Sequence, residues 1–125
     1  GAMDSAEVFE AVGGEAYFVD LVDAFYVGVE SDPLLRPMYP DDLTESKEHL
    51  VLFLVQYFGG PPRYLENRGH PRMRMRHAPY AITEEAANAW LAHMRSAMVS
   101  SGAPEEAVAE MDGYFSFAAR ALRNA

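Results

Sequence analysis

The sequence contains no cysteine, and this absence removes several classes of chemistry. Without thiols the chain forms no disulfide, thiolate metal site, iron–sulfur cluster or cysteine nucleophile. It also lacks an apolar run near the roughly 20 residues that cross a bilayer. We therefore expect a soluble cytoplasmic protein with no membrane partner, whose chemistry comes from histidine, carboxylates, hydroxyls or a bound cofactor.

Basic residues are scarce as well: 10 Lys and Arg stand against 19 Asp and Glu, a formal net charge of -9. Such a surface repels polyanions, so we expect no nucleic-acid partner. Half of the basic residues are nevertheless arginines between positions 63 and 77, where Glu66 is the only acid. This local concentration suggests a small anionic group held at one place, because a polyanion would need a broad basic face.

The length and the pattern of apolar residues indicate an all-α protein. With 125 residues, half of them hydrophobic, the chain is expected to form one domain over 1–125, in which 1–3 resemble a cloning scar. Apolar residues recur at helical steps of three and four, and no stretch alternates with the period of a strand. The four main helices are expected at 15–30, 44–57, 83–98 and 104–122, after an N-terminal turn at 7–12.

Local signals mark the ends of these helices. The hydroxyl of Thr44 is expected to cap the free amides of its helix, and Thr83 followed by Glu84 and Glu85 indicates another helix start, with acids at the positive end of the helix dipole. Gly102 suits the left-handed residue that ends a helix. Between positions 63 and 82 there is no sustained helical period, so we expect a long loop around a short helix, and loops of that length in compact domains are usually functional.

Four residues are candidates for a site. His77 lies among the arginines of this loop, where it is either an ordinary surface or core histidine or the metal ligand of a cofactor. A flat, mostly apolar cofactor with carboxylates, such as haem, would use one histidine for its metal and nearby Arg and Tyr for its acid groups. Tyr26, Tyr39 and Trp90 face inward on their helical stripes, either as core residues or as hydrogen-bond donors around one pocket.

An ordered set of motifs resembles the group II truncated haemoglobins of bacteria, from about Phe9 to Asn124. The motifs are Val12-Gly13-Gly14-Glu15, Phe25-Tyr26, Met38-Tyr39-Pro40, Gly59-Gly60-Pro61, Arg68-Gly69-His70-Pro71-Arg72-Met73-Arg74-Met75-Arg76-His77-Ala78-Pro79-Tyr80 and Trp90-Leu91. The resemblance implies a shortened globin in which helices pack two over two around haem b.

The resemblance also implies a role for each site residue. His77 corresponds to the proximal iron ligand, and Tyr26, Tyr39 and Trp90 to the distal hydrogen-bonding set. Ser46 is expected at the gate position, and Leu50 and Phe53 on the distal face of the haem. His49, Tyr64 and Arg76 are expected to contact the propionates, and Met73 to pack against the ring. Phe58 stands where relatives often carry Trp, and His49 where they often carry a long basic side chain.

Three functions are consistent with these residues. The leading hypothesis is a haem protein that binds dioxygen, NO and CO at the iron. The second is a redox enzyme that oxidises NO with dioxygen or turns over peroxide, which requires a partner reductase. The third is a helical interaction module without haem, whose arginine-rich loop docks on an acidic partner. Truncated globins are commonly monomers or homodimers, and we expect a homodimer.

Overall fold

The computed structural model describes residues 2–64 and 81–124, and every regular element in this part of the chain is a helix. Two single turns, η1 (Ser5–Glu7) and η2 (Arg36–Met38), accompany the short helix α1 (Val8–Ala11). The longer helices are α2 (Glu15–Glu30), α3 (Thr44–Tyr57), α6 (Glu84–Val99) and α7 (Glu105–Leu122). The predicted all-α fold is confirmed, and the four main helices begin and end within a few residues of the expected positions.

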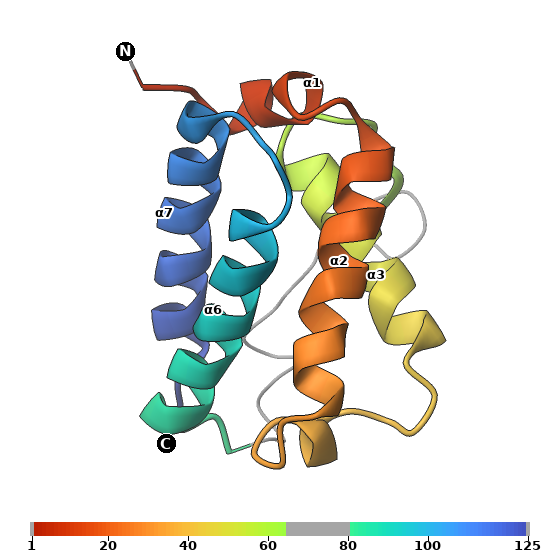
Figure 1. Cartoon of the computed structure of the whole chain (residues 1–125), viewed down its shortest axis with the longest axis vertical. Helices are drawn as coiled ribbons and strands as arrows, with labels where there is room; N and C mark the ends of the chain where they lie inside the picture. The colour runs from red at the N-terminus through yellow and green to blue at the C-terminus, as the bar shows by residue number, and fades with distance from the viewer. Residues whose placement is uncertain (1, 65–80, 125) are drawn as a thin grey trace.

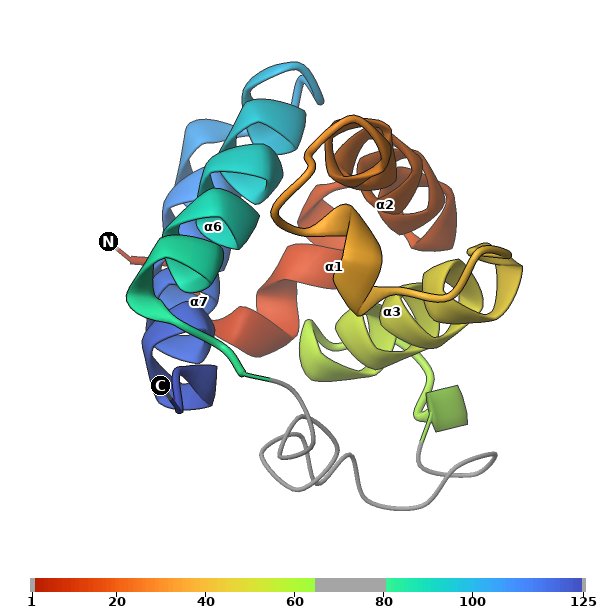
Figure 2. The same cartoon turned by 90° about the horizontal axis from the view of Figure 1, so that it is seen from below.

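The long helices form two facing pairs. α2 packs against α3, α6 packs against α7, and α2 and α6 join the two pairs. Figures 1 and 2 show this arrangement from two sides, with α1 across the end of the bundle where α3 stops. No helix in the described ranges is long and apolar enough to span a membrane.

The starts of α3 and α6 show how short side chains set helix boundaries. Thr83 precedes α6, and its Oγ1 accepts a hydrogen bond of 3.1 Å from the backbone N–H of Ala86, as expected of a cap. α3 begins at Thr44 as expected, but the expectation that the Thr44 hydroxyl caps it was wrong, because Thr44 is already the first residue of the helix. Its own backbone N–H donates to the Asp42 carboxylate at 2.9 Å, so the capping oxygen comes from two residues earlier.

One end of the bundle, near α1, is densely filled; we call it the closed end. The Phe18 ring stacks between Phe9 and Phe58, with centroid distances of 6.4 and 5.9 Å. The Phe9 amide donates to the Phe58 carbonyl at 2.8 Å. Gly59 follows with φ +101°, and a Cβ there would overlap the carbonyl oxygen of Ala6. Only glycine permits this backbone approach.

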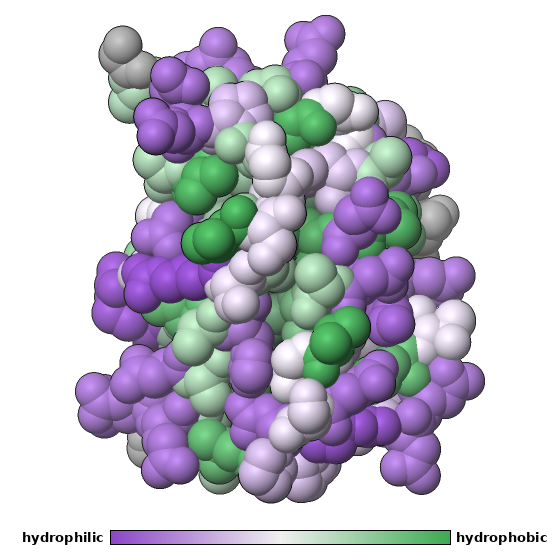
Figure 3. Space-filling model, in the orientation of Figure 1, coloured by the Kyte–Doolittle hydropathy of each residue, from purple (hydrophilic) through white to green (hydrophobic). Residues whose placement is uncertain are grey.

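The surface in the view of Figure 1 is mostly polar, with separate small apolar areas rather than one large patch (Figure 3). Among the described residues Phe117 on α7 is the most exposed aromatic side chain, at 62%. Single exposed apolar residues are normal on a folded protein.

Candidate functional site

An apolar pocket opens at the end of the bundle away from α1, and we call this end the open end. The pocket holds about 640 Å³ of space not filled by atoms, including its mouth. Its walls come from the η2 segment, α3, α6 and α7: Leu35, Met38, Tyr39, Leu50, Phe53, Leu54, Ile82, Ala86, Ala87, Trp90, Tyr114, Phe115, Ala118, Ala119 and Leu122. Apart from two tyrosines and the tryptophan, these side chains have no polar group that forms conventional hydrogen bonds, a composition typical of sites for largely apolar ligands.

Helical periodicity explains why these residues share one cavity. α3 contributes Leu50, Phe53 and Leu54, which lie on one face because they are three and four residues apart. α6 and α7 each contribute a pair of adjacent alanines, and Ala87 and Ala119 belong to one apolar cluster with Ile82. Alanine at these buried positions leaves room that a larger side chain would fill.

Tyr39 and Trp90 provide polar groups on this wall. The indole N–H of Trp90 hydrogen-bonds the Tyr39 hydroxyl, since an indole can only donate. Burial nevertheless raises the pKa of Tyr39 to about 12, against the lowering effect of that bond. Tyr39 is thus a neutral hydroxyl at physiological pH, able to donate to a ligand in the pocket.

Tyr26 lies behind Tyr39 rather than on the pocket wall. It is 3% exposed, and its ring meets the Tyr39 ring edge-on, with centroids 5.5 Å apart. Burial and the neighbouring Tyr39 raise the pKa of Tyr26. Phe25, the residue before it, packs edge-on against Trp90 at 5.4 Å. The structure therefore brings Tyr26, Tyr39 and Trp90, from three separate segments, to one side of the pocket.

The other residues singled out from the sequence have different positions. Leu50 and Phe53 line the pocket, and the buried Tyr64 meets Phe53 edge-on, with ring centroids 5.6 Å apart. Ser46 and His49 lie outside it, in a surface hollow, and His49 Nε2 is 3.7 Å from Glu45 Oε1. Met73, Arg76 and His77 lie outside the described residues.

Several wall residues carry no signal of a site in the sequence. They are Leu35, Met38, Ile82 and Tyr114. The alanine pairs of α6 and α7 gave no distinguishing signal, because alanines at this helical spacing are equally typical of a filled core. Nor did Tyr114, whose spacing on α7 is also that of an ordinary core residue.

The pocket fits a flat apolar group that carries a polar centre. Its hydrocarbon walls suit a macrocycle, and Tyr39 and Trp90 place a hydroxyl and an indole on one side only. Ile82, which follows the arginine-rich segment by a few residues, is itself a wall residue. This combination fits haem, whose faces are apolar and whose iron takes ligands along the ring normal.

Comparisons with known proteins agree with this geometry. The bacterial-like globin family model matches residues 7–124, which include all five α-helices described above. Among curated proteins, the group 2 truncated hemoglobin YjbI of Bacillus subtilis (strain 168) is 46% identical over 116 residues, which are 93% of this chain and 87% of the relative.

Solved structures show the same likeness. A hemoglobin from the thermophilic phototrophic bacterium Chloroflexus aurantiacus matches with a TM-score of 0.93 and 52% identity, over 95% of this chain and 98% of the other. A truncated oxygen-avid haemoglobin from Bacillus subtilis matches with a TM-score of 0.90 and 45% identity, over 94% of this chain and 99% of the other.

Proposed function

Because the chain belongs to the bacterial-like globin family and, within it, to the group II truncated haemoglobins, we propose that it binds haem b in the apolar pocket and holds dioxygen, NO or CO there. Membership of this family makes the protein a haem globin that binds small gases. The observation that carries the finer proposal is the Tyr39–Trp90 pair on an otherwise apolar wall.

His77 is our candidate for the protein ligand of the iron. When bound, the haem supplies the metal centre at which a diatomic gas is held. The resemblance places His77 at the proximal position, and His77 precedes the wall residue Ile82 by only five residues. An imidazole at this position would hold the cofactor in the pocket through its metal.

Tyr39 and Trp90 are our candidates for holding the gas, with Tyr26 supporting Tyr39 from behind. The Tyr39 hydroxyl, which accepts from the Trp90 indole, can donate its own proton to the gas, and a donor to a charged or polarised ligand contributes about 1.5 to 3 kcal/mol. Such a donor would favour dioxygen over CO, because dioxygen takes on the larger partial negative charge. The B. subtilis protein with a similar structure is described as oxygen-avid.

The remaining contacts follow the same proposal. Leu50 and Phe53 would cover the gas side of the haem, and Tyr64, whose ring contacts Phe53, is a proposed contact of a propionate. Arg76 and His49 are the other proposed propionate contacts, Met73 is proposed to pack on the ring, and Ser46 to stand at the gas entrance. His49 and Ser46 share a surface hollow, which suits the rim of a site rather than its interior.

A redox enzyme, of peroxidase or NO dioxygenase type, is the alternative. One observation favours it: the ring of Tyr114 on the pocket wall lies against the ring of Tyr57, tilted by 33° at a centroid distance of 4.0 Å, and Tyr57 is 40% exposed. Two adjoining phenols between a pocket and the surface offer an electron route. Steady-state turnover with a physiological reductant distinguishes this function from gas binding alone.

The absorption spectrum tests the proposal directly. The purified chain should show a Soret band, alone or after haem is added, and should bind CO after reduction. His77→Gly should lose haem retention, and added imidazole should restore it in part. A chain with no Soret band after haem addition would instead support the interaction module without haem.

A further inference from the structure

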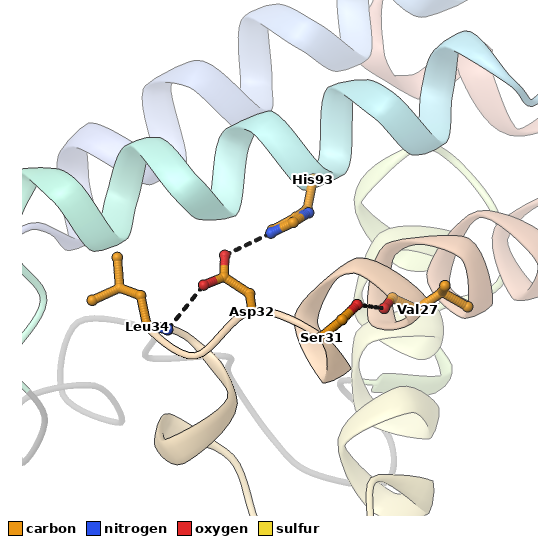
Figure 4. A network of polar contacts seen from close by, with 5 residues as sticks. All are labelled: Val27, Ser31, Asp32, Leu34 and His93. Atoms are coloured by element: carbon orange, nitrogen blue, oxygen red, sulfur yellow. Dashed lines mark hydrogen bonds and ion pairs between the residues drawn. The ribbon is translucent and has the colours of Figure 1, made fainter.

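A polar contact outside the pocket joins the end of α2 to α6 (Figure 4). His93 Nε2 on α6 lies 2.7 Å from Asp32 Oδ2, in the turn that follows α2. The two side chains are 27% and 17% exposed, which makes this contact more sheltered than an ordinary surface ion pair. The bond from His93 is the largest of the influences that hold the pKa of Asp32 below its usual value.

Asp32 also organises the chain that follows it. Its other carboxylate oxygen, Oδ1, accepts a hydrogen bond of 2.9 Å from the Leu34 N–H. Its carbonyl accepts one of 2.8 Å from the Arg36 N–H. Asp32 therefore attaches the start of η2 to α6 through one side chain, and Figure 4 shows both of its carboxylate contacts.

Arg36 holds the other end of the same segment. Its guanidinium donates to the carbonyls of Tyr39, Pro40 and Asp41, at 3.3, 3.0 and 2.9 Å. These bonds fix the backbone at Tyr39, whose hydroxyl accepts from the Trp90 indole. The whole segment from Asp32 to Asp41 is thus tied internally, and its orientation on the bundle depends on where it meets α6.

The contacts form a closed ring through α6. Trp90 and His93 are three residues apart on that helix, so both project from neighbouring positions on one face. We propose that His93 and Asp32 are positioning residues, which hold the η2 segment so that the Tyr39 hydroxyl stays against the Trp90 indole. This inference rests on the proposed gas site, and adds two residues that touch neither the gas nor the haem in that proposal.

Gly28 on α2 leaves the space in which the His93 ring reaches Asp32. A Cβ at position 28 would overlap Nδ1 of His93, so the imidazole lies directly against the helix backbone. An alanine there would push the ring away from Asp32 without removing any polar group. Gly28→Ala therefore offers a second route to the loss of the His93 contact.

The test uses the CO-bound ferrous holoprotein and its single tryptophan, whose indole N–H gives one assignable signal. The variants are His93→Leu, His93→Gln and Gly28→Ala. Loss of one hydrogen bond of ordinary strength corresponds to about fivefold. We expect His93→Leu and Gly28→Ala to raise solvent exchange of the indole proton by about that factor, and to shift the C–O stretching frequency. His93→Gln, whose amide can still donate to Asp32, should stay close to the parent.

Two comparisons separate positioning from simple destabilisation. Exchange at buried α7 amides such as Met111 should rise less than at the indole, because general loosening would raise both alike. Gly113→Ala, at a helical glycine with nothing near its Cβ position, should leave the indole unchanged. Arg95→Ala, which removes the α6–α7 contact with Asp112, should also leave it unchanged.

The outcomes are distinct. An unmoved indole signal and C–O stretch in both His93→Leu and Gly28→Ala would overturn the positioning role, as would equal effects of His93→Gln and His93→Leu. If His93→Leu does not fold, Gly28→Ala alone decides. A parent protein without a Soret band would instead remove the proposed function, which the spectrum shows before any variant is measured.

Discussion

The closed and open ends of this bundle are made from the same kind of amphipathic helix, yet one is filled and the other is hollow. At the closed end Phe9, Phe18 and Phe58 stack, and a glycine brings two backbone segments together. At the open end paired alanines on α6 and α7 leave space beside Tyr39 and Trp90. In this fold, the residues that fill the core and the residues that leave room for a ligand therefore lie at opposite ends of the bundle.

The largest expected effect is on folding, at the closed end. Gly59→Ala forces an L residue to adopt φ +101° and places its Cβ on the Ala6 carbonyl, so we expect it to lower the free energy of unfolding by about 3 kcal/mol or more. Urea unfolding of the CO-bound protein measures this loss. CO binding by the folded fraction should not change.

Gly13→Ala provides the matched control. Gly13 has φ +97°, but nothing lies within 4 Å of its Cβ position. Only the backbone strain remains, and we expect a loss of about 1 to 2 kcal/mol. Equal losses in the two variants would show that the close approach at Gly59 contributes nothing to the closed end.

Removal of one hydroxyl at the open end should act on the gas instead. Tyr39→Phe deletes a donor proposed to hold dioxygen, so its dissociation should become about 10-fold to 150-fold faster. The CO dissociation rate should change less. Stopped-flow replacement of dioxygen by CO measures the effect, and Trp90→Phe should act in the same direction.

Removal of a tyrosine hydroxyl at the closed end is the control. Tyr17 Oη lies 2.8 Å from Ser101 Oγ, and neither residue lines the pocket. Tyr17→Phe should lower the free energy of unfolding by about 1 kcal/mol and leave dioxygen release unchanged. If Tyr39→Phe and Trp90→Phe, singly and together, also leave release unchanged, the distal role of this pair is wrong.

A larger side chain in the pocket should leave the stability of the fold nearly unchanged but weaken the binding of haem. Ala119→Leu places three more carbons in the pocket, so we expect haem affinity to fall by about tenfold, which corresponds to about 1.4 kcal/mol. Transfer of haem to an excess of apomyoglobin measures this loss. The free energy of unfolding of the haem-free chain should change by less than about 0.5 kcal/mol.

Ala97→Leu makes the same enlargement at a core position outside the pocket. Ala97 is 5% exposed, belongs to the main core cluster and does not line the pocket. Overpacking such a position costs about 1 to 3 kcal/mol, so this variant should lose stability and retain its haem. Similar haem loss in both alanine variants would mean that the two regions are not separate.

The fold could be predicted almost completely from the sequence, because helix positions depend on local spacing. The apolar steps of three and four over 15–30 match α2, and α6 begins directly after Thr83 as expected. The start of α3 at Thr44 was also correct, but its capping oxygen comes from Asp42 rather than from Thr44. Such errors arise where two residues able to cap stand close together, and they change the capping residue without changing the helix.

The site could be predicted only in part. Tyr26, Tyr39 and Trp90 stood out as aromatic residues with polar groups, and the resemblance grouped them before any contact was known. The hollow beside them could not be predicted, because Ala87 and Ala119 have the same helical spacing as alanines in a filled core. The Asp32–His93 contact spans 61 positions and leaves no periodic pattern, so only the tertiary structure shows it.

The smallest expected effect is that of pH on the open end. Burial raises the pKa of Tyr39 to about 12, so its hydroxyl stays neutral and able to donate at every pH up to roughly 10. Dioxygen dissociation should therefore be constant within about twofold between pH 7 and 10. A charged distal donor with an ordinary pKa would instead give a step in the rate.

The same pKa determines how Tyr39 contributes to stability. Because folding raises this pKa, the unfolded chain loses its proton first as the pH rises. The contribution is thus complete below pH 10 and is lost between about pH 10 and 12. Tyr39→Phe should flatten this alkaline decline in the free energy of unfolding, measured by urea titration at each pH. An unchanged decline would mean that it comes from other tyrosines whose pKa is raised by burial, such as Tyr26 and Tyr114. It would also mean that Tyr39 is more exposed to water than its place on the pocket wall implies.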